Sequence, residues 1–454
     1  MRKHIAIIGG GISGLAVLHY LKQKYPAASD VQINLFEKEG RSGGVIQSSN
    51  HSGCLFESGP NGILDSKEQA MALIRELGLE GEILRAAPAA KLRFIAWRGR
   101  LHALPANPAG LLTFSPLSLF DKLRLFWEPC VPGRPSPEES VYDFGRRRFG
   151  KGVAEILLDC LAKGIYGADI RRMSLKAAFP LLYDLESKHG SVLKGLMALM
   201  KQRKQALPPG KPRSSPFGQL CSFRRGMQQL PQEIYSRYQH HIHLGEDVMG
   251  MKKEGGGYVI ETPKVKYFAD QVFICTPAYT AARLIADANA EVCGLLKKIE
   301  YVPILVAGLV YHTKDLKKIP EGFGYLVPTE GNSEILGVLF SGNIFPGHTE
   351  PEKFLFRVLI RPGRPDIDPR TFLPTAIEEV RSRFSITADP VERCYSYLAH
   401  AIPLYGLEHP RITEQLAAGM RDLPNCHLAG NYLGGISVAD CIQNTKGLVE
   451  ESDG

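Results

Sequence analysis

The sequence contains no apolar run long enough to cross a bilayer and no recognisable targeting segment. A transmembrane helix needs about 18 consecutive apolar residues. The first predicted strand begins directly after Lys3, which leaves no room for a cleavable leader. We therefore expect no membrane-spanning helix.

Patterns for disulfides and metal sites are also missing. The nine cysteines include no C-x-x-C pair, and their odd number without a secretory signal favours reduced thiols. We expect no metal site. The sequence also offers no convincing acid–base pair, so it predicts no catalytic side chain.

The chain has little excess charge. Its formal net charge of +8 is spread over 454 residues and forms no basic tail, and we expect no nucleic-acid partner. One interpretation is a solvated basic surface, and the other is attraction to anionic lipid or to a polycarboxylate ligand. The 44% hydrophobic and 22% charged residues are typical of a globular protein, and the length suggests roughly two to four domains.

The N-terminus has the pattern of a nucleotide-binding unit. A buried strand is predicted over residues 4–8, a helix from the following glycine turn to about residue 24, and a second strand over residues 31–37. Glu37 ends the second strand, where a carboxylate can accept hydrogen bonds from a ribose.

Three glycines lie between the first strand and the helix. Gly9 allows the tight turn, Gly11 lets the backbone approach a pyrophosphate, and Gly14 lets the helix pack closely on the strand. The N-terminus of the helix then offers free N–H groups to the phosphates. Together with Glu37, the turn predicts dinucleotide binding.

Three further segments resemble the flavin amine oxidase superfamily. Residues 37–44 are similar to its E-x₃-R-x-G-G signature, residues 271–277 to its central strand, and residues 427–440 to its last strand, glycine turn and helix. The resemblance implies FAD, and the FAD is expected to be non-covalent because no cysteine lies in an S-G-G-C context. The implied cofactor-binding residues are Gly9, Gly10, Gly11, Ile12, Ser13, Gly14, Glu37, Lys38, Arg41, Gly43, Gly44, Val45, Gly59, Pro60, Asn61, Gly62, Val248, Asn431, Ile436, Ser437 and Val438.

The last helix also has an expected electrostatic role. Reduced flavin carries negative charge near N1 and O2, and a helix N-terminus near residues 436–438 would place a positive dipole there. Only one nucleotide fingerprint is present, whereas reductases that use NAD(P)H often carry a second. The sequence therefore favours an oxidase or dehydrogenase whose organic substrate reduces the flavin.

The resemblance narrows to the protoporphyrinogen oxidases and covers nearly the whole chain. Similar segments lie at residues 56–63, 159–169, 173–180, 222–231 and 401–405, where Leu404 replaces the usual Gln. The resemblance implies that six electrons and six protons are removed from protoporphyrinogen IX to give protoporphyrin IX, in heme biosynthesis. Oxygen would reoxidise the flavin.

A few substrate contacts are implied by the same resemblance. Arg93 would pair with a propionate, because a guanidinium meets a carboxylate with two parallel hydrogen bonds. Phe323 and Leu326 would be apolar clamps on the macrocycle, with Ile360 as a looser match. At Gly164 and Ala168, backbone carbonyls would face the pyrrole N–H groups.

The expected fold class is α/β with three parts. A discontinuous Rossmann-like FAD-binding domain would comprise residues 1–88, 216–290 and 401–454, an α+β substrate-binding domain residues 291–400, and a helical membrane-binding and substrate-access domain residues 89–215. Within the last, residues 101–136 combine prolines with an apolar set that resembles the family's membrane-binding region. A second helical core is the alternative interpretation of this segment.

The implied partners are a porphyrinogen and molecular oxygen. The protein is expected to be cytoplasmic and peripheral to the inner membrane in a bacterium, or at the mitochondrial inner membrane in a eukaryote. A homodimer and a handover of product to ferrochelatase are left open. So are three other functions: a coproporphyrinogen III oxidase, a carotenoid desaturase or amine oxidase, and a flavin-binding protein without turnover.

Overall fold

The computed structural model describes residues 2–26, 30–105, 107–133, 135–206, 218–329, 333–363 and 366–452. A loop was expected over residues 206–218, and all of it except its two ends lies outside the described residues. Within the described part of the chain, no helix is both long and apolar enough to cross a bilayer.

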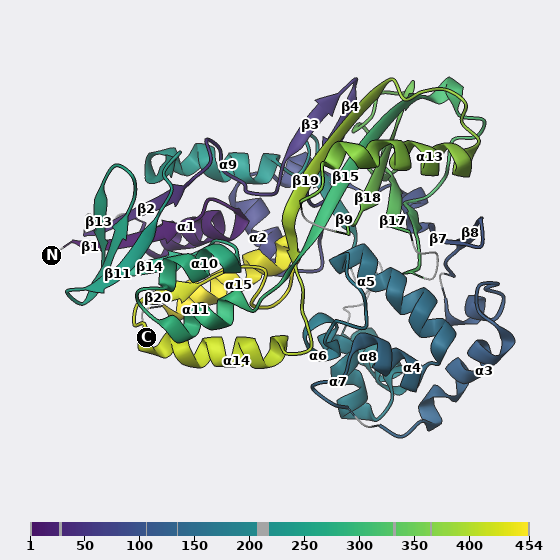
Figure 1. Ribbon diagram of the computed structural model, residues 1–454, viewed down its shortest axis with the longest axis horizontal. Coiled ribbons are helices and arrows are strands. Elements are labelled where there is room, and N and C mark those ends of the chain that lie inside the picture. Colours follow the sequence, from purple (N-terminus) through teal and green to yellow (C-terminus); the bar gives the residue numbers. More distant parts are fainter. Residues whose placement is uncertain are drawn as a thin grey trace.

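A five-stranded parallel sheet joins segments that are far apart in the sequence (Figure 1). Its inner strands are buried on both faces, as expected for parallel strands covered by helices. The strands expected at the start, middle and end of the chain therefore lie in one sheet. In spatial order they are β10 (Ile242–Leu244), β2 (Val31–Glu37), β1 (Lys3–Ile8), β14 (Gln271–Ile274) and β20 (Cys426–Leu428).

Helices cover both faces of this sheet. One apolar cluster joins it to α1, α2, α9 and α15, and another joins its opposite face to α10, α11, α14 and a three-stranded sheet. The glycine-rich sequence of residues 254–257 predicts a hairpin turn, and Glu254 pairs with Gly257 at the end of this hairpin. The elements are α1 (Ile12–Lys24), α2 (Glu68–Glu76), α9 (Gln229–Tyr238), α10 (Ala278–Ile285), α11 (Ala290–Lys297), α14 (His409–Gly419), α15 (Val438–Glu451), β11 (Gly250–Glu254), β12 (Gly257–Glu261) and β13 (Lys266–Ala269).

A seven-stranded sheet forms the second layer system. Helix α13 packs on one of its faces through the cluster that contains Phe356 and Val358, and α5 packs on the other through the cluster that contains Leu355. All neighbouring strands are antiparallel except β16 and β7. In spatial order the strands are β19 (Glu392–Pro403), β15 (Tyr301–His312), β18 (Lys353–Ile360), β17 (Ile335–Phe340), β16 (Gly324–Leu326), β7 (Arg93–Trp97) and β8 (Arg100–Ala103), and α13 spans Leu373–Phe384.

Two boundaries differ from the sequence-based expectation. Residues 93–103, expected in the helical part, form β7 and β8 of the seven-stranded sheet. Helix α11, expected mostly within the substrate-binding part, packs beside α10 on the five-stranded sheet. The β7–β8 hairpin turns at Arg98 and Gly99, which both have positive φ (46° and 78°), and this X-Gly pair is a turn signal that the sequence analysis overlooked.

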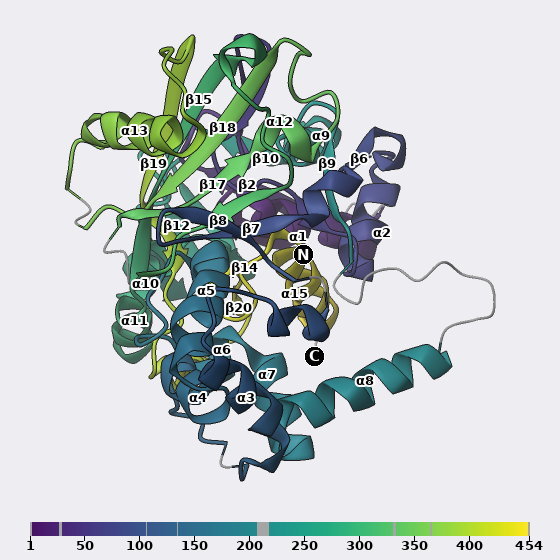
Figure 2. The ribbon, with the colours of Figure 1, turned by 90° about the vertical axis from the view of Figure 1, so that its right-hand side faces the viewer.

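The helices between residues 119 and 206 form a separate unit, from which α8 projects away (Figure 2). The guanidinium of Arg148 is fully buried in this unit between the carboxylates of Glu128 and Glu186. The helices are α3 (Leu119–Trp127), α4 (Val141–Arg148), the π-helix η5 (Val153–Leu158), α5 (Asp159–Tyr166), α6 (Leu175–Ala178), α7 (Pro180–His189) and α8 (Val192–Ala206).

Short elements connect these layers. They are the strands β3 (Ser48–His51), β4 (Cys54–Glu57), β5 (Ile63–Leu64), β6 (Ile83–Arg85) and β9 (Leu220–Phe223), and the helix α12 (Ser341–Ile344). Strands β3 and β4 pair with each other, and β9 lies between β5 and β6.

Candidate active site

The glycine turn after β1 is too tight for other residues at two positions. Gly9 has φ +105°, and a Cβ atom added to Gly14 would lie 1.9 Å from the carbonyl oxygen of Gly9. A Cβ atom on Gly11 would meet no atom within 4 Å, so this side of the turn faces open space. Among the described residues, no side chain caps the N-terminus of α1, whose first turn includes Ile12 and the buried Ser13. Its N–H groups are therefore available to phosphate oxygens.

Two more loops pack against this turn. The N–H of Gly43 donates to the carbonyl of Gly10 at 2.7 Å, and a Cβ atom on Gly44 would lie 3.3 Å from Cα of Gly11. Arg41 donates to the carbonyl of Gly44 at 2.9 Å, so it holds its own loop in shape. The exposed Val45 follows, and the next loop approaches its carbonyl so closely that Gly59 could carry no side chain.

The loop after Gly59 carries a buried donor that has no partner among the described residues. The side-chain nitrogen Nδ2 of Asn61 is buried and has no hydrogen-bond partner among the described residues. Pro60 precedes it, and Gly62 packs on β9, where a Cβ atom would lie 2.7 Å from the carbonyl oxygen of Cys221. Because a buried amide without a partner is costly, Asn61 is suited to meet a polar group of a ligand.

The carboxylate of Glu37 is buried at the edge of the turn. Its two oxygens accept hydrogen bonds from the N–H groups of Gly10 at 2.6 Å and Glu39 at 2.8 Å. Each oxygen keeps a lone pair for a ribose hydroxyl. The side chain of Lys38 is exposed. Val248 is buried and comes shortly after β10, the strand that pairs with β2.

The final segment of the chain closes the same edge. The hydroxyl of Tyr405 donates to the carbonyl of Asn431, and Ile436 packs on the apolar cluster around Tyr405. Ser437 caps α15 through Asp440, so its hydroxyl is already engaged, and the Asp440 carboxylate offsets part of the positive dipole expected at Ser437 and Val438. A hollow of about 520 Å³ lies beside this segment, with Gly430, Gly434 and Asp440 among its lining residues.

These groups fit FAD. Free N–H groups at a helix N-terminus suit a pyrophosphate, a buried carboxylate suits a ribose, and the orphaned amide of Asn61 suits the polar edge of a flavin ring. Most of the expected cofactor-binding residues follow β1, β2, β10 or β20, and the parallel pairing of these strands within the five-stranded sheet brings their carboxyl ends to one edge.

Two pairs of the expected substrate residues are in contact. The guanidinium carbon of Arg93 lies 5.0 Å from the ring centroid of Phe323. Arg93 is exposed to solvent, yet desolvation by surrounding protein lowers its pKa, as expected for a group that lines a cavity. Leu326 packs on α5 so closely that a Cβ atom on Gly164 would lie 3.2 Å from its side chain.

The other two expected substrate residues lie on different faces of the seven-stranded sheet. Ala168 is 2% exposed and belongs to the apolar cluster on which Leu326 also packs. Ile360 is fully buried on the α13 face of the sheet, so it does not face Leu326. Its neighbour Leu359 is half-buried and packs on the opposite face. Because side chains alternate along a strand, a shift of one residue changes the face, and β18 is apolar on both faces, so its sequence does not indicate which face a residue takes.

Sequence reasoning missed a buried pair behind the Gly59 loop. Arg357 of β18 is 3% exposed and donates to the carbonyl of Gly59. Burial lowers its pKa to about 10, an effect that the charge of Glu57 partly offsets. Burial raises the pKa of Glu57 to about 7, although hydrogen bonds from the N–H of Met227 and the hydroxyl of Ser48 act in the opposite direction. An arginine within the apolar strand β18 was the available signal.

Comparison with known proteins agrees with this site. The flavin containing amine oxidoreductase family matches residues 12–445, and the chain belongs to that family. The prediction of a flavin cofactor is thereby confirmed. The mixed α/β fold is shared with a crystal structure of a protein from Exiguobacterium sp. 255-15, which covers 99% of this chain and 98% of that one with a TM-score of 0.82 and 23% identity.

Within the family, the chain is similar to porphyrinogen oxidases. It is 30% identical to protoporphyrinogen oxidase of Bos taurus, over 98% of this chain and 97% of the relative. It is 26% identical to coproporphyrinogen III oxidase of Bacillus subtilis (strain 168), over 99% of this chain and 98% of the relative.

The glycine turn makes a prediction about cofactor retention. Gly14→Ala would place a methyl group against the Gly9 carbonyl and push α1 away from β1. We expect the purified variant to lose most of its FAD, measured as the ratio of absorbance at the flavin band to protein absorbance. Gly294→Ala in α11, where a Cβ atom meets nothing within 4 Å, is the matched control and should keep its FAD. Full FAD content in folded Gly14→Ala would contradict the role of the turn.

The raised pKa of Glu57 predicts how the stability of the protein depends on pH. Its pKa is raised from 4.5 to about 7, so between these values the folded protein holds a proton that the unfolded chain has released. The free energy of unfolding therefore falls as pH rises through this window. Glu57→Gln should flatten the dependence of Tm on pH between these two values and raise Tm at pH 7, whereas the exposed Glu378→Gln should not. Equal pH slopes for the parent and Glu57→Gln would refute the shift.

Proposed function

We propose that this flavoenzyme oxidises protoporphyrinogen IX to protoporphyrin IX, removing six electrons and six protons, with oxygen as the final acceptor. The observation that supports this choice most directly is the wall built from β7, β16 and α5. It presents a cation, Arg93, beside the apolar Phe323, and the apolar Leu326 against Gly164. A large apolar macrocycle with carboxylates at one end suits such a wall.

The residues of the chain would mainly orient the substrate. Bound FAD supplies a two-electron acceptor, so the reaction is three successive two-electron steps. Arg93 would hold a propionate, the backbone of Gly164 would accept a hydrogen bond from a pyrrole N–H, and Phe323 with Leu326 would exclude water. Pyrrole nitrogen lone pairs stabilise the cation left at the oxidised bridge, so the step needs no protein acid. Each round then releases its protons from the bridge and ring nitrogens.

Coproporphyrinogen III is the second candidate substrate, because of the similarity to the Bacillus subtilis enzyme. Four carboxylates would require more substrate-facing cations than Arg93, which is the cation that we propose to bind a propionate. Mixing the holoenzyme anaerobically with each porphyrinogen, and then following porphyrin fluorescence in air, separates the candidates. We expect both to bleach the flavin and protoporphyrinogen to have the larger kcat/KM. A preference for the four-carboxylate substrate would reverse the choice, and no bleaching by either would remove the proposed activity.

Arg93 generates a kinetic prediction. Arg93→Ala removes the proposed partner of a propionate but leaves the flavin groove intact, so KM should rise by about tenfold or more while kcat falls less. Arg100→Ala is the matched control, because Arg100 is exposed on the neighbouring strand β8. Steady-state turnover of both variants on protoporphyrinogen measures the difference. An unchanged KM in Arg93→Ala would remove Arg93 from the site.

Peripheral membrane association is also proposed, through α3. This helix lies at the outer edge of the molecule (Figure 1). Its polar residues face the protein: Asp121 accepts from the N–H of Gly152 at 3.1 Å, and Arg124 donates to the carbonyl of Arg147 at 2.8 Å. Its large apolar side chains face outward, which suits burial in a bilayer surface. They are Leu119, Phe120, Leu123, Phe126 and Trp127, with exposed fractions from 59% to 75%.

The apolar residues of the 101–136 segment include both buried and exposed side chains. Phe114 and Leu117 are buried, at 4% and 2% exposure, and belong to the helical core. Phe114 and Leu117 therefore belong to a second helical core, whereas the apolar side chains of α3 are exposed.

The outward face of α3 predicts vesicle binding. The double variant Phe120→Ser with Trp127→Ser should weaken binding of the holoenzyme to phosphatidylglycerol vesicles by about tenfold or more, because two large apolar groups no longer leave water. Val265→Ser, which removes an exposed apolar side chain from the turn between β12 and β13, should bind as the parent does. Cosedimentation measures both. Equal binding of all three proteins would contradict docking through α3.

A further inference from the structure

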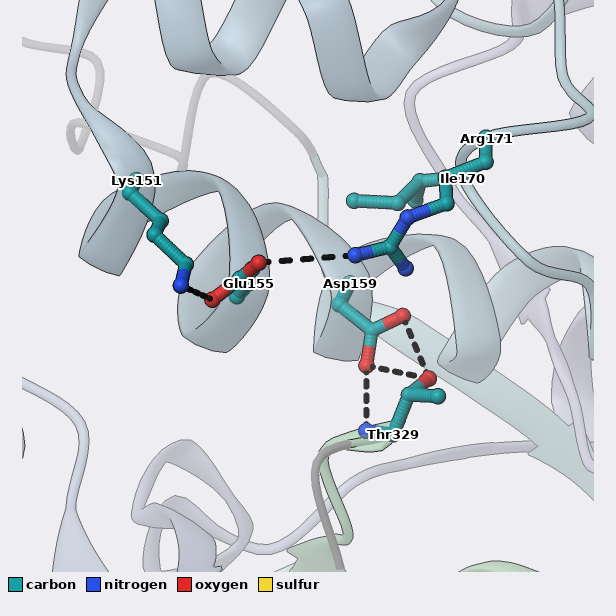
Figure 3. A pocket seen from close by; sticks show the side chains of 6 residues that line it. All are labelled: Lys151, Glu155, Asp159, Ile170, Arg171 and Thr329. Carbon is teal, nitrogen blue, oxygen red and sulfur yellow. Dashed lines mark hydrogen bonds and ion pairs between the residues drawn. The ribbon is translucent and has the colours of Figure 1, made fainter. Parts of the chain in front are cut away.

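Two side chains of helix α5 bind the segment that follows β16. Figure 3 shows one of them, Asp159, with its partner Thr329. The Asp159 carboxylate accepts from the N–H of Thr329 at 2.7 Å and from its hydroxyl at 2.9 Å. One turn further along α5, the Lys163 ammonium donates to the carbonyl of Val327 at 2.9 Å. Both side chains of the helix thus bind the same short segment of main chain.

The two fastening groups are charged and buried. The side chains of Asp159 and Lys163 are 2% and 1% exposed, and their charged atoms are 3.4 Å apart. Burial lowers the pKa of Lys163, and the charge of Asp159 opposes that shift. A buried ion pair often stabilises a fold no better than apolar residues of the same volume. A gain in stability therefore does not by itself account for the pair, whereas a fixed geometry does.

The fastened elements carry the proposed substrate wall. Leu326 is the last residue of β16 and packs on Gly164, which directly follows Lys163 in α5. Phe323, which contacts Arg93, directly precedes β16. The spacing between α5 and the end of β16 therefore sets how far apart the Gly164 backbone and the Leu326 side chain lie.

A π-helical turn immediately precedes the pair. The segment η5 (Val153–Leu158) ends at the residue before Asp159, where α5 begins. A π turn inserts one extra residue and rotates the following residues around the helix axis, and such turns occur frequently at functional sites. Here the rotation places Asp159 and Lys163 on the side of α5 that faces Val327 and Thr329.

We propose that Asp159 and Lys163 are positioning residues for the porphyrinogen, which set the spacing between α5 and the end of β16. The proposal rests on the proposed function. Neither residue needs to touch the substrate, because each acts through main-chain atoms of the 327–329 segment. Loss of the pair should let Leu326 move from Gly164, so that the macrocycle is held less firmly while the flavin groove stays intact.

The test compares three single variants as holoenzymes. Asp159→Asn removes the charge opposite Lys163 and one of the two acceptor functions, and Thr329→Val removes only the hydroxyl. Asp159, Thr329 and Glu155 line one hollow of about 200 Å³ (Figure 3). The matched control is Glu155→Gln, because Glu155 pairs with Lys151 at 3.8 Å and with Arg171 at 3.4 Å, and no hydrogen bond joins it to Thr329 among the residues drawn in Figure 3.

Five quantities are measured: KM and kcat for protoporphyrinogen, Kd for protoporphyrin IX from fluorescence quenching, flavin content, and Tm. We expect KM and Kd to rise together, by about tenfold in Asp159→Asn and less in Thr329→Val, with kcat within about threefold of the parent. Flavin content should not change, and Glu155→Gln should match the parent in all five quantities.

The outcomes separate positioning from a merely structural role. A lower Tm with unchanged KM and Kd in Asp159→Asn would overturn the proposal. If Asp159→Asn does not fold, Thr329→Val decides: a raised KM and Kd support positioning, and parental values overturn it. A parent enzyme that turns over neither porphyrinogen contradicts the proposed function itself, which is a different result from a parent that is active and variants that match it.

Discussion

The close approach of α1 to β1 determines the geometry around the flavin groove. Because Gly14 allows this approach, the helix N-terminus lies directly at the turn, and α15 packs beside α1 on the same face of the sheet. β14 pairs with β1, and β20 with β14, all in parallel. The carboxyl ends of parallel strands share one edge of a sheet, so the loops after β1 and β20 meet there although more than 400 residues separate them, as in other dinucleotide-binding folds.

Local patterns in the sequence were sufficient for the elements that repeat a simple rule. Strands β1 and β2 and helix α1 were predictable, because apolar residues dominate them and a glycine turn marks the boundary between β1 and α1. β19 was not, since its partly exposed residues show no clean alternation and its pairing with β15 shifts register between Val302 and Ile304. Such pairing depends on contacts about 100 residues apart, which no local pattern encodes.

The residues of the site also fall into those that a local sequence pattern predicts and those that only the folded chain brings together. The cofactor glycines were predictable because a sharp turn or a close approach excludes other residues there, as Gly9 and Gly14 show. Ile360 was placed on the wrong face because the resemblance located the strand but not its phase. The contact between Arg357 and Gly59 joins residues 298 positions apart, so only the folded chain reveals it.

The walls of the proposed cavity are held by one kind of contact, in which a cationic side chain donates to a main-chain carbonyl. Apolar packing is non-directional. It therefore opposes the separation of two apolar layers more strongly than it opposes their sliding past each other. Here buried or half-buried cations bind main-chain carbonyls on the loops around the cavity: Arg357 binds Gly59, Lys163 binds Val327, and Arg361 binds Gly167 at 3.2 Å. Hydrogen bonds are directional, and those from charged donors are stronger than neutral ones. Three walls that come from different layers are thereby held in register, because directional hydrogen bonds fix the positions of Gly59, Val327 and Gly167.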